Sequence, residues 1–408
     1  MDIKITPSLL KGAVNIPASK SCAHRVIISA ALAGGKSVIT GVTMSKDIDA
    51  TMNAMSALGA SFSVHGETIT VEGIEVPTTK AVIDCNESGS TLRFIMPIAA
   101  ALGTDSEFNG RGRLPQRPID IYKRELGKNG VKFVTAEMPY RLRGKLKGGR
   151  YEIEGNVSSQ FVTGLLFALP LIEEDSEIVL TSHLESAPYV DITIDILSRF
   201  GIVIDRTENG FFIKGGQQYR AHDEKIEGDY SQAAFFCVAN ALGSDVELGN
   251  LFPESVQGDK RIFDIVSEAC ENGRITSFKA DCSDIPDLVP ILSVFGAFGT
   301  GESVIFNAER LRIKESDRLA TTAAMLNELG GDVTVTDDGL IIRPTGNMHG
   351  GVVDGAGDHR IVMAAAIAAT RTSGEVMIKG AEAAEKSYPD FFKDYSKLGG
   401  SINVIHLE

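Results

Sequence analysis

The chain has 408 residues, 43% hydrophobic and 23% charged, which suits a soluble globular protein of two or three domains. Asp and Glu outnumber Lys and Arg by 54 to 40, and the resulting net charge of −14 argues against nucleic acid as a partner. The longest apolar run, residues 165–172, contains a proline and is too short to span a membrane. The opening residues alternate as a strand does and carry no targeting pattern, so we expect a cytoplasmic protein.

Cysteine and histidine patterns predict neither a disulfide framework nor a metal site. The cysteines are odd in number and form no Cys-x-x-Cys pair, so most are expected to be buried as small apolar side chains. The seven histidines stand apart from one another, without the spacing of a metal-binding motif.

A helix that ends in glycine and is followed by an alternating strand recurs six times. The last glycine of each copy is Gly59, Gly130, Gly201, Gly273, Gly331 or Gly400. Glycine ends a helix readily because it enters the left-handed region without a Cβ penalty. The strands at residues 62–64 and 333–335 alternate as half-buried antiparallel strands do. A spacing near 70 residues fits a small α/β subdomain, and six of these predict two domains of three units each.

Polar residues gather where several of the predicted helices begin. The clusters are residues 19–25, 87–91, 158–160, 229–231, 314–318 and 358–360. Ser, Thr and Asp are preferred N-caps, so capping alone explains any single cluster. We expect Ser21 to share a helix face with Arg25, and Lys314 to share one with Arg318, because each pair is four residues apart.

Capping does not explain the cations in these clusters, namely Lys20, Arg25, Lys314, Arg318 and Arg360. A cation in the first turn opposes the helix dipole, at a cost of about 0.3–1 kcal/mol. A bound anion reverses that effect, because backbone N–H groups and cationic side chains then converge on negative charge. Several such helix ends in one chain predict substrates with more than one anionic group.

A basic stretch interrupts the otherwise acidic chain between Arg111 and Arg150, with 12 Lys or Arg against 3 acidic residues. A solvated basic face is the simpler interpretation. The alternative is a functional Arg117, stiffened by the following proline for bidentate contact with a carboxylate or phosphate.

Taken in order along the full length, these motifs resemble the 3-phosphoshikimate 1-carboxyvinyltransferase family of enolpyruvyl transferases. The matching motifs are residues 17–21 with Arg25, 117–118, 158–161, 186–189 with 191–193, 227–229, 257–259, 285–287, 314–318, 358–360 and 386–391. No single tripeptide is decisive, but the ordered set is specific.

The resemblance implies an α/β fold of two domains, an inside-out α/β barrel with three βαβαββ units in each domain. One domain combines residues 1–17 with 228–408, and residues 18–227 form the other, inserted domain. Glycines 59, 130 and 201 of the repeat then fall in the inserted domain. The active site is expected in the cleft between the domains, and the family expectation is a monomer without metal or cofactor.

The implied reaction transfers the enolpyruvyl group of phosphoenolpyruvate to the 5-hydroxyl of shikimate 3-phosphate and releases phosphate, by addition and elimination through a tetrahedral intermediate. By resemblance, shikimate 3-phosphate is bound by Lys20, Ser21, Arg25, Ser158, Ser159, Gln160, Ser186, Tyr189, Asp287 and Lys314. Phosphoenolpyruvate is bound by Lys20, Gly89, Arg117, Gln160, Arg318, His359, Arg360 and Lys386. We expect Asp287 and Lys314 to act around the 5-hydroxyl and Glu315 to donate a proton to carbon.

Two positions depart from the usual family pattern. Residues 87–90 read Glu-Ser-Gly-Ser where Asn-Ala-Gly-Thr is usual, so Glu87 replaces an amide while Gly89 is kept. Because Gly89 leaves room, we expect sensitivity to glyphosate, the family's inhibitor that competes with phosphoenolpyruvate. The second departure is Arg310-Leu311, where many members carry Asn-Trp.

Two alternatives stay open at this stage. The sister transferase that acts on UDP-N-acetylglucosamine has Lys-Asn where this chain has Lys20-Ser21, and it usually has a cysteine in the loop at residues 111–117, where this chain has none. A non-catalytic anion-binding protein with the same fold is the other alternative, because architecture does not guarantee activity.

Overall fold

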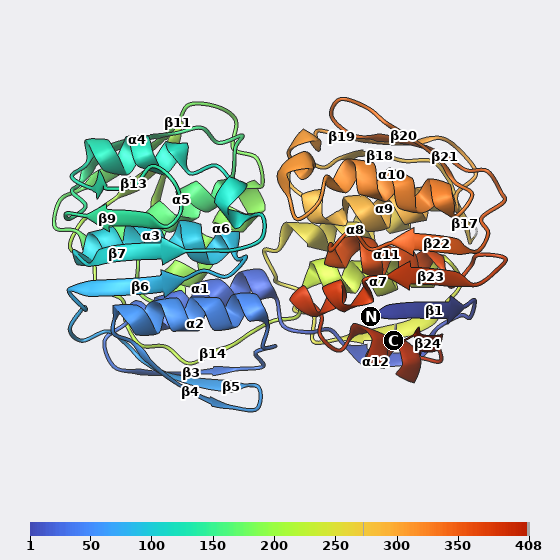
Figure 1. Ribbon diagram of the computed structural model, residues 1–408, viewed down its shortest axis with the longest axis horizontal. Helices are drawn as coiled ribbons and strands as arrows, with labels where there is room; N and C mark the ends of the chain where they lie inside the picture. Colours follow the sequence, from blue (N-terminus) through green and yellow to red (C-terminus); the bar gives the residue numbers. More distant parts are fainter. Residues whose placement is uncertain (272, 406–408) are drawn as a thin grey trace. The chain divides into compact units, whose positions relative to one another are not determined.

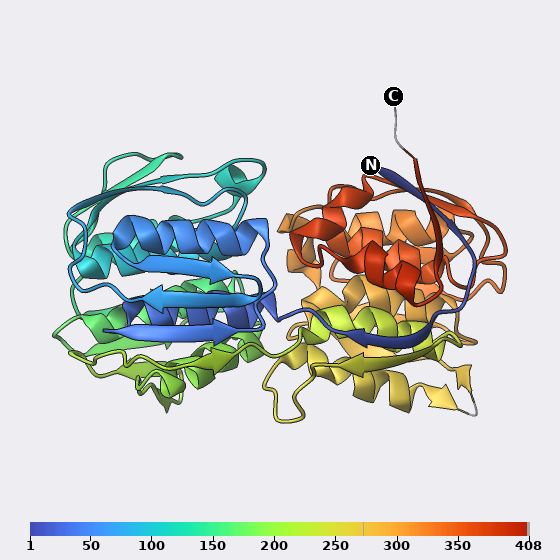
Figure 2. The same ribbon diagram turned by 90° about the horizontal axis from the view of Figure 1, so that it is seen from below.

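The computed structural model describes residues 1–271 and 273–405, and it contains two compact units (Figures 1 and 2). The split unit combines Met1–Pro17 with Gly228–Glu408, and the inserted unit comprises Ala18–Glu227. Each unit has a hydrophobic core of its own. Asn272, which belongs to the fourth copy of the predicted repeat, and residues 406–408 lie outside the described residues.

The inserted unit holds strands β3 to β14 and helices α1 to α6. The strands are β3 (Lys36–Thr40), β4 (Ser61–His65), β5 (Thr68–Glu72), β6 (Lys80–Asp84), β7 (Asp105–Asn109), β8 (Lys132–Phe133), β9 (Tyr140–Arg143), β10 (Gly149–Ile153), β11 (Ser176–Leu180), β12 (Asp205–Thr207), β13 (Gly210–Ile213) and β14 (Glu224–Lys225). The helices are α1 (Lys20–Leu32), α2 (Lys46–Leu58), α3 (Gly89–Leu102), α4 (Asp120–Lys128), α5 (Ser159–Ala168) and α6 (Ala187–Arg199), with short 3-10 helices at Leu114–Gln116 and Leu169–Leu171.

The split unit holds the remaining elements. Its strands are β1 (Asp2–Thr6), β2 (Lys11–Asn15), β15 (Asp245–Gly249), β16 (Cys270–Glu271), β17 (Arg274–Ile275), β18 (Lys279–Asp281), β19 (Ser303–Phe306), β20 (Asp332–Val335), β21 (Leu340–Arg343), β22 (Gly351–Asp354), β23 (Val376–Lys379) and β24 (Ser401–Ile405). Its helices are α7 (Tyr230–Ala241), α8 (Ile262–Glu268), α9 (Val289–Ala297), α10 (Arg318–Glu328), α11 (His359–Ala368) and α12 (Phe391–Lys397). Its 3-10 helices are Gly258–Arg261, Pro286–Leu288, Glu309–Ile313 and Ala381–Lys386.

One rule of strand pairing repeats through the described residues. In the β6–β9 sheet, β6 and β7 are parallel, β9 is antiparallel to β7, and β8 is antiparallel to β9. The orders β10-β11-β13-β12, β14-β3-β5-β4, β18-β19-β21-β20 and β22-β23-β1-β24 follow the same rule. The remaining repeat, which contains α7 and α8, has the parallel pair β2–β15 and the hairpin β16–β17 as separate two-stranded sheets. The predicted α/β fold of six βαβαββ units is therefore confirmed, and its sheets remain separate instead of closing into one hydrogen-bonded barrel.

Two of these sheets are completed by a strand that is distant in sequence. Strand β14 pairs with β3, almost two hundred residues earlier in the chain, as the register of Glu224 opposite Ile39 shows. Strand β1 inserts between β23 and β24, so the blue and red ends of the chain lie side by side in Figure 1. Each unit thus closes on itself through a strand from the other end of its sequence.

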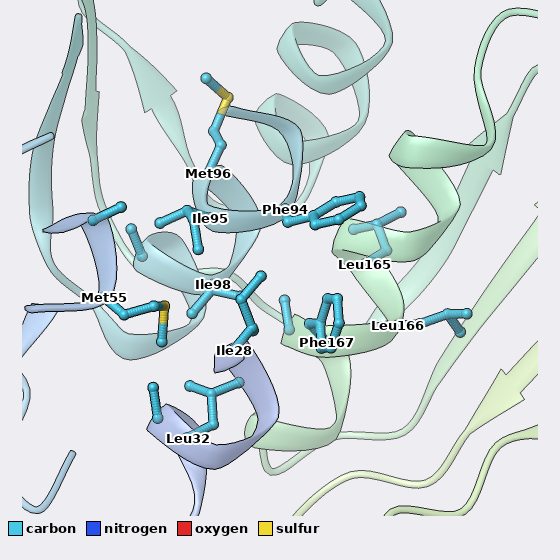
Figure 3. Close-up of a cluster of buried hydrophobic side chains, with 14 of the residues drawn as sticks. Ile28, Leu32, Met55, Phe94, Ile95, Met96, Ile98, Leu165, Leu166 and Phe167 are labelled. Carbon is cyan, nitrogen blue, oxygen red and sulfur yellow. The ribbon is translucent and has the colours of Figure 1, made fainter. Parts of the chain in front are cut away.

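The first helix of every repeat is the buried one. Helices α7, α9 and α11 are buried along nearly their whole length in the split unit, as are α1, α3 and α5 in the inserted unit. Figure 3 shows the result in the inserted unit, where Phe94 of α3, Phe167 of α5 and Ile28 of α1 meet. Burial of each such side chain contributes about 1.5–3 kcal/mol, so this helical centre is the main source of stability.

Helix α3 contains Pro97, which lacks the N–H that would bond to the carbonyl of Arg93. The buried hydroxyl of Tyr122 lies 2.8 Å from that carbonyl oxygen and 3.0 Å from the carbonyl oxygen of Phe161 in α5. Nearby, a Cβ added to Gly164 of α5 would lie 2.2 Å from the Arg93 carbonyl oxygen. The close crossing of α3 and α5 therefore depends on a glycine, and a tyrosine replaces the missing donor.

The glycine repeat is correct in outline and wrong at three positions. Gly59, Gly130 and Gly201 have positive φ at the ends of α2, α4 and α6. In the last two copies the left-handed residue is the first glycine of the pair, Gly330 or Gly399, which follows the C-cap residue of the helix, Leu329 or Leu398. Gly273 lies between β16 and β17, beyond the end of α8, and turns a hairpin instead of ending a helix.

The predicted alternation of buried and exposed residues is not found in β4. Its pairing with β5 is antiparallel as expected, but β4 is almost wholly exposed, and Val64 keeps 41% of its surface accessible. The reason is that β4 is the edge strand of its sheet. In β20 the alternation is better kept, with Val333 buried between exposed neighbours.

Within the described residues, no helix is both long enough and apolar enough to cross a membrane. Four of the five cysteines are buried and Cys270 is intermediate, as expected for small apolar side chains.

Candidate active site

The split unit holds two buried arginines that share one carboxylate. Arg318 is the first residue of α10, and Arg360 is the second residue of α11. Asp287, in the 3-10 helix before α9, accepts a hydrogen bond from Nη1 of Arg318 on Oδ1 and one from Nη2 of Arg360 on Oδ2, both at 2.9 Å. Burial opposes ionisation of Asp287, but the positive charges of Arg360, Lys314 and Arg318 outweigh it and hold its pKa well below the usual range.

Two further carboxylates surround Arg318. Nε of Arg318 donates to Oδ2 of Asp358 at 2.9 Å, and Nη2 donates to Oε2 of Glu315 at 2.8 Å. Asp358 is also the N-cap of α11. Burial acts to raise the pKa of Asp358, but neighbouring positive charge, chiefly that of Arg318, outweighs burial and lowers this pKa. The sequence predicted that Arg318, a cation at a helix start, binds a substrate anion. In the structure, its charge is balanced by carboxylates of the protein itself.

Lys314 does not share a helix face with Arg318, contrary to our expectation. It follows the 3-10 helix Glu309–Ile313 in an extended conformation, and α10 begins only at Arg318. The reason is that Asp317, not an earlier residue, caps α10 by accepting from the backbone N–H of Ala320. Burial, aided by the charges of Arg318 and Arg310, lowers the pKa of Lys314 to about 8 against the opposing effect of Asp287 and Glu315. A lysine of this kind exchanges protons readily near neutral pH.

In the inserted unit, Arg25 joins the first turns of α1 and α6. Its guanidinium donates to the carbonyl oxygen of Ser21 at 2.7 Å, to the carbonyl oxygen of Tyr189 at 2.9 Å and to Oγ1 of Thr193 at 2.8 Å. The predicted proximity of Ser21 and Arg25 on one helix is confirmed. The bonds to Tyr189 and Thr193 bring α6 into this group. Ser186, the N-cap of α6, is buried and has a left-handed φ of 57°. Burial lowers the pKa of Arg25 to about 10.

A second group in the inserted unit surrounds Gln160 of α5. Its Oε1 accepts from Nη1 of Arg93 at 2.8 Å, and its Nε2 donates to Oγ of Ser90 at 3.0 Å. A Cβ added to Gly89 would lie 2.7 Å from Nη1 of Arg117, so the glycine permits the close approach of that guanidinium. Gly89, Arg117 and Gln160, which are far apart in sequence, therefore lie together.

Most other basic residues between Arg111 and Arg150 form exposed ion pairs. Arg111 pairs with Asp84, Arg141 with Glu107 at 2.7 Å, and Arg150 with Glu177 at 3.1 Å. The solvated-face interpretation therefore holds for this stretch as a whole, and Arg117 is distinguished by its place beside Gly89.

The remaining predicted residues occupy simpler positions. Nζ of Lys20 lies 3.1 Å from Oδ2 of Asp47, and Nζ of Lys386 donates to the carbonyl oxygen of Gly357 at 3.2 Å. Ser158 is the N-cap of α5, and Ser159 is its first residue. His359 is buried as the first residue of α11.

The two departures from the family pattern also have definite neighbours. A Cβ added to Gly112 would lie 2.6 Å from Oε1 of Glu87, so the Glu87 side chain lies against the loop before Leu114–Gln116. The guanidinium of Arg310 donates to the carbonyl oxygen of Ser283, in the loop before Asp287.

Several residues of these groups were given no role in the sequence analysis. Arg93, Asp358 and Ser231 are the main ones, and Nη2 of Arg360 donates to Oγ of Ser231 at 3.0 Å. For Arg93 a signal existed, because a single arginine inside the apolar run of α3 must find buried partners. Among the described residues, no group of three or more His, Cys, Asp or Glu side chains is arranged to hold a metal ion.

Comparison with known proteins gives a consistent result. The family model described as EPSP synthase (3-phosphoshikimate 1-carboxyvinyltransferase) matches residues 5–395. Proteins named 3-phosphoshikimate 1-carboxyvinyltransferase are 45% identical in Clostridium novyi, with 98% of both chains covered, and 41% identical in Clostridioides difficile, with 99% of both covered. The solved EPSP synthase of Acinetobacter baumannii superposes with a TM-score of 0.85 at 26% identity, over 99% of this chain and 100% of that one.

A solved structure of the enolpyruvyl transferase NikO from Streptomyces tendae has a TM-score of 0.79 at 17% identity, over 98% of both chains, which is a likeness of fold alone. The family match over nearly the whole chain and the identity to curated relatives both point to the same family. This chain belongs to the EPSP synthase (3-phosphoshikimate 1-carboxyvinyltransferase) family.

Proposed function

We propose that this protein transfers the enolpyruvyl group of phosphoenolpyruvate to the 5-hydroxyl of shikimate 3-phosphate and releases phosphate. The observation that carries the proposal is the cluster of Asp287, Lys314, Arg318 and Arg360, which joins two buried guanidiniums to a carboxylate and to a lysine whose pKa is about 8. Such a cluster offers both anion binding and proton transfer in one place. Membership of the family supplies the identity of the substrates.

The proposed chemistry is addition followed by elimination. The 5-hydroxyl oxygen bonds to C2 of phosphoenolpyruvate as its proton leaves and C3 gains a proton, which gives a tetrahedral intermediate. Loss of phosphate and of a C3 proton then restores the double bond. Asp287 and Lys314 act around the 5-hydroxyl, and Glu315, three residues before Arg318 and hydrogen-bonded to it, donates the proton to C3.

The binding roles follow the groups in each unit. In the inserted unit, shikimate 3-phosphate is held by Lys20, Ser21, Arg25, Ser158, Ser159, Gln160, Ser186 and Tyr189. Phosphoenolpyruvate is held by Lys20, Gly89, Arg117 and Gln160 of the inserted unit and by Arg318, His359, Arg360 and Lys386 of the split unit. We further propose that the two units are domains whose helix starts face a common cleft, and that the protein acts as a cytoplasmic monomer. Sedimentation at micromolar concentration tests whether the protein is a monomer.

The decisive experiment measures phosphate release from phosphoenolpyruvate with and without shikimate 3-phosphate. We expect release only when both substrates are present, and kcat losses well over tenfold without lost binding in Asp287→Asn and Glu315→Gln. Arg343→Met, at an exposed ion pair of the split unit, is the matched control and keeps full turnover. Stabilisation by either ligand without turnover would instead support a non-catalytic anion-binding protein.

Glyphosate offers a second test of the phosphoenolpyruvate site. We propose that it competes with phosphoenolpyruvate, since Gly89 is kept. An inhibition constant far above the KM for phosphoenolpyruvate would contradict this.

A further inference from the structure

Thr193 is a polar residue of α6 that is fully buried and has no role in the mechanism described so far. Its hydroxyl lies 2.8 Å from Nε of Arg25, in α1, and 3.1 Å from the hydroxyl of Thr163, in α5. It also donates to the carbonyl oxygen of Tyr189, one turn earlier in α6, at 2.9 Å. A single hydroxyl thus joins α1, α5 and α6 of the inserted unit.

The direction of each of these hydrogen bonds follows from the chemistry of the groups. A threonine hydroxyl has one proton and two lone pairs, whereas a guanidinium can only donate and a carbonyl oxygen can only accept. Thr193 therefore accepts from Arg25 and gives its own proton to the carbonyl oxygen of Tyr189. Thr163 is fully buried and its hydroxyl has no other partner among the described residues, so every group is satisfied only when Thr163 donates to Thr193. The proton and both lone pairs of the Thr193 hydroxyl are then in use.

These bonds fix one edge of the Arg25 guanidinium. Nε donates to the Thr193 hydroxyl and Nη2 donates to the carbonyl oxygen of Tyr189 at 2.9 Å, so the two groups of α6 form a bidentate acceptor. Nη1 donates to the carbonyl oxygen of Ser21 at 2.7 Å, and the ring centre of Phe94 lies 5.2 Å from the guanidinium carbon. Three of the five N–H groups of Arg25 are used in this way within the described residues, and one on each Nη is left for a ligand.

We propose that Thr193 is a positioning residue for shikimate 3-phosphate, because its fully bonded hydroxyl holds the Arg25 guanidinium in the orientation that presents the remaining N–H groups to an anionic group of the substrate. The proposal rests on the proposed function, in which Arg25 binds shikimate 3-phosphate. Without the hydroxyl, Nε of Arg25 lacks an acceptor in a buried place, and the guanidinium loses its fixed orientation. Binding of shikimate 3-phosphate then weakens, whereas phosphoenolpyruvate, which is assigned to other side chains, is little affected.

The test compares the wild type with Thr193→Val and Thr193→Ser, with each substrate varied at saturation of the other. Valine has the outline of threonine without the hydroxyl, so we expect the KM for shikimate 3-phosphate to rise about tenfold or more. The kcat and the KM for phosphoenolpyruvate change by less than about twofold. Serine restores the hydroxyl and with it most of the affinity. Thr104→Val is the matched control, because Thr104 is also buried in the inserted unit and donates to the carbonyl oxygen of Thr78 at 2.6 Å, and it leaves both KM values unchanged.

An unchanged KM for shikimate 3-phosphate in Thr193→Val would overturn the proposal. Equal rises of both KM values would also overturn it, since they mark a general structural effect. Thr193→Ala carries the same expectation and replaces Thr193→Val if that variant does not fold.

A second measurement on the ligand-free proteins does not depend on turnover. In nitrogen-15 NMR spectra, the Nε–H signal of Arg25 is identified by its absence from Arg25→Lys. We expect this proton to exchange slowly with water in the wild type and in Thr193→Ser, because a buried acceptor holds it. Exchange in the wild type as fast as that of an exposed arginine would refute the fixed guanidinium. Failure of the wild type to release phosphate would refute only the proposed function.

Discussion

Replacing Arg318 by methionine tests the electrostatic account of the split unit. The side chain of Arg318 is 2% exposed and bonds to three carboxylates, of which Asp358 is fully buried while Asp287 and Glu315 keep 21% and 25% of their side-chain surfaces exposed. Removing one partner of a buried ion pair costs about 3–5 kcal/mol. Because water can rehydrate the two partly exposed carboxylates, we assign this loss chiefly to Asp358 and expect the total to stay within that range.

The assay is urea unfolding of the full chain at pH 7, with hydrogen exchange of α10 and α11 to report on the split unit. Arg343→Met is the control, since Arg343 is 44% exposed and pairs with Glu302, and an exposed pair contributes about 0–1 kcal/mol. A loss below about 1 kcal/mol for Arg318→Met, no larger than that of the control, would refute the reasoning.

The pH dependence of the same variant has a definite sign. The pKa values of Asp287 and Asp358 are lowered in the folded protein, so these groups stabilise it above the unfolded pKa of about 4, and this stabilisation is lost as the pH falls through the folded values. Without Arg318 the shifts are smaller, so the difference in stability between wild type and variant is present at pH 7 and shrinks only as the pH falls below about 4, through the folded values. An equal difference at pH 7 and at pH 3 would contradict the carboxylate explanation.

Three further substitutions test packing in the inserted unit. Gly164→Ala forces a Cβ against the backbone of α3 and is expected to destabilise by about 1–3 kcal/mol in urea unfolding, whereas Gly127→Ala, in open space on α4, is neutral or stabilising. Tyr122→Phe removes the hydroxyl that faces the α3 carbonyl left by proline, at a cost of about 1–3 kcal/mol, and an unchanged stability would show that water replaces it. Gly89→Ala displaces Arg117 and is expected to raise the KM for phosphoenolpyruvate about tenfold or more with little effect on shikimate 3-phosphate; equal changes for both substrates would argue against the assignment.

Local chemistry explains which parts of the fold were predictable. Helix starts could be read from Ser19, Ser88, Ser158 and Asp358, each of which accepts a hydrogen bond as an N-cap. Helix ends before Gly59 and Gly201 were equally clear, because a positive φ favours glycine. The resemblance, and not the repeat, supplied the βαβαββ order, because periodicity carries no information on which strands pair.

Other features depended on contacts between distant segments. The pairing of β14 with β3 and of β1 with β24 joins residues at opposite ends of a unit, and no local pattern specifies it. The exposure of β4 follows from its edge position, which only the finished sheet defines. Lys314 was misplaced for a local reason, since Asp317 caps α10 and the helix therefore begins only at Arg318.

The amino-acid sequence by itself determined where most of the helices of this protein begin and end, because capping and backbone preferences act over a few residues. Tertiary structure alone decided that Asp287 is shared by Arg318 and Arg360. It did so because charge state depends on burial and on neighbours brought in from other repeats. A buried carboxyl group is an anion beside one partner and a neutral acid beside another, and only packing selects the partner.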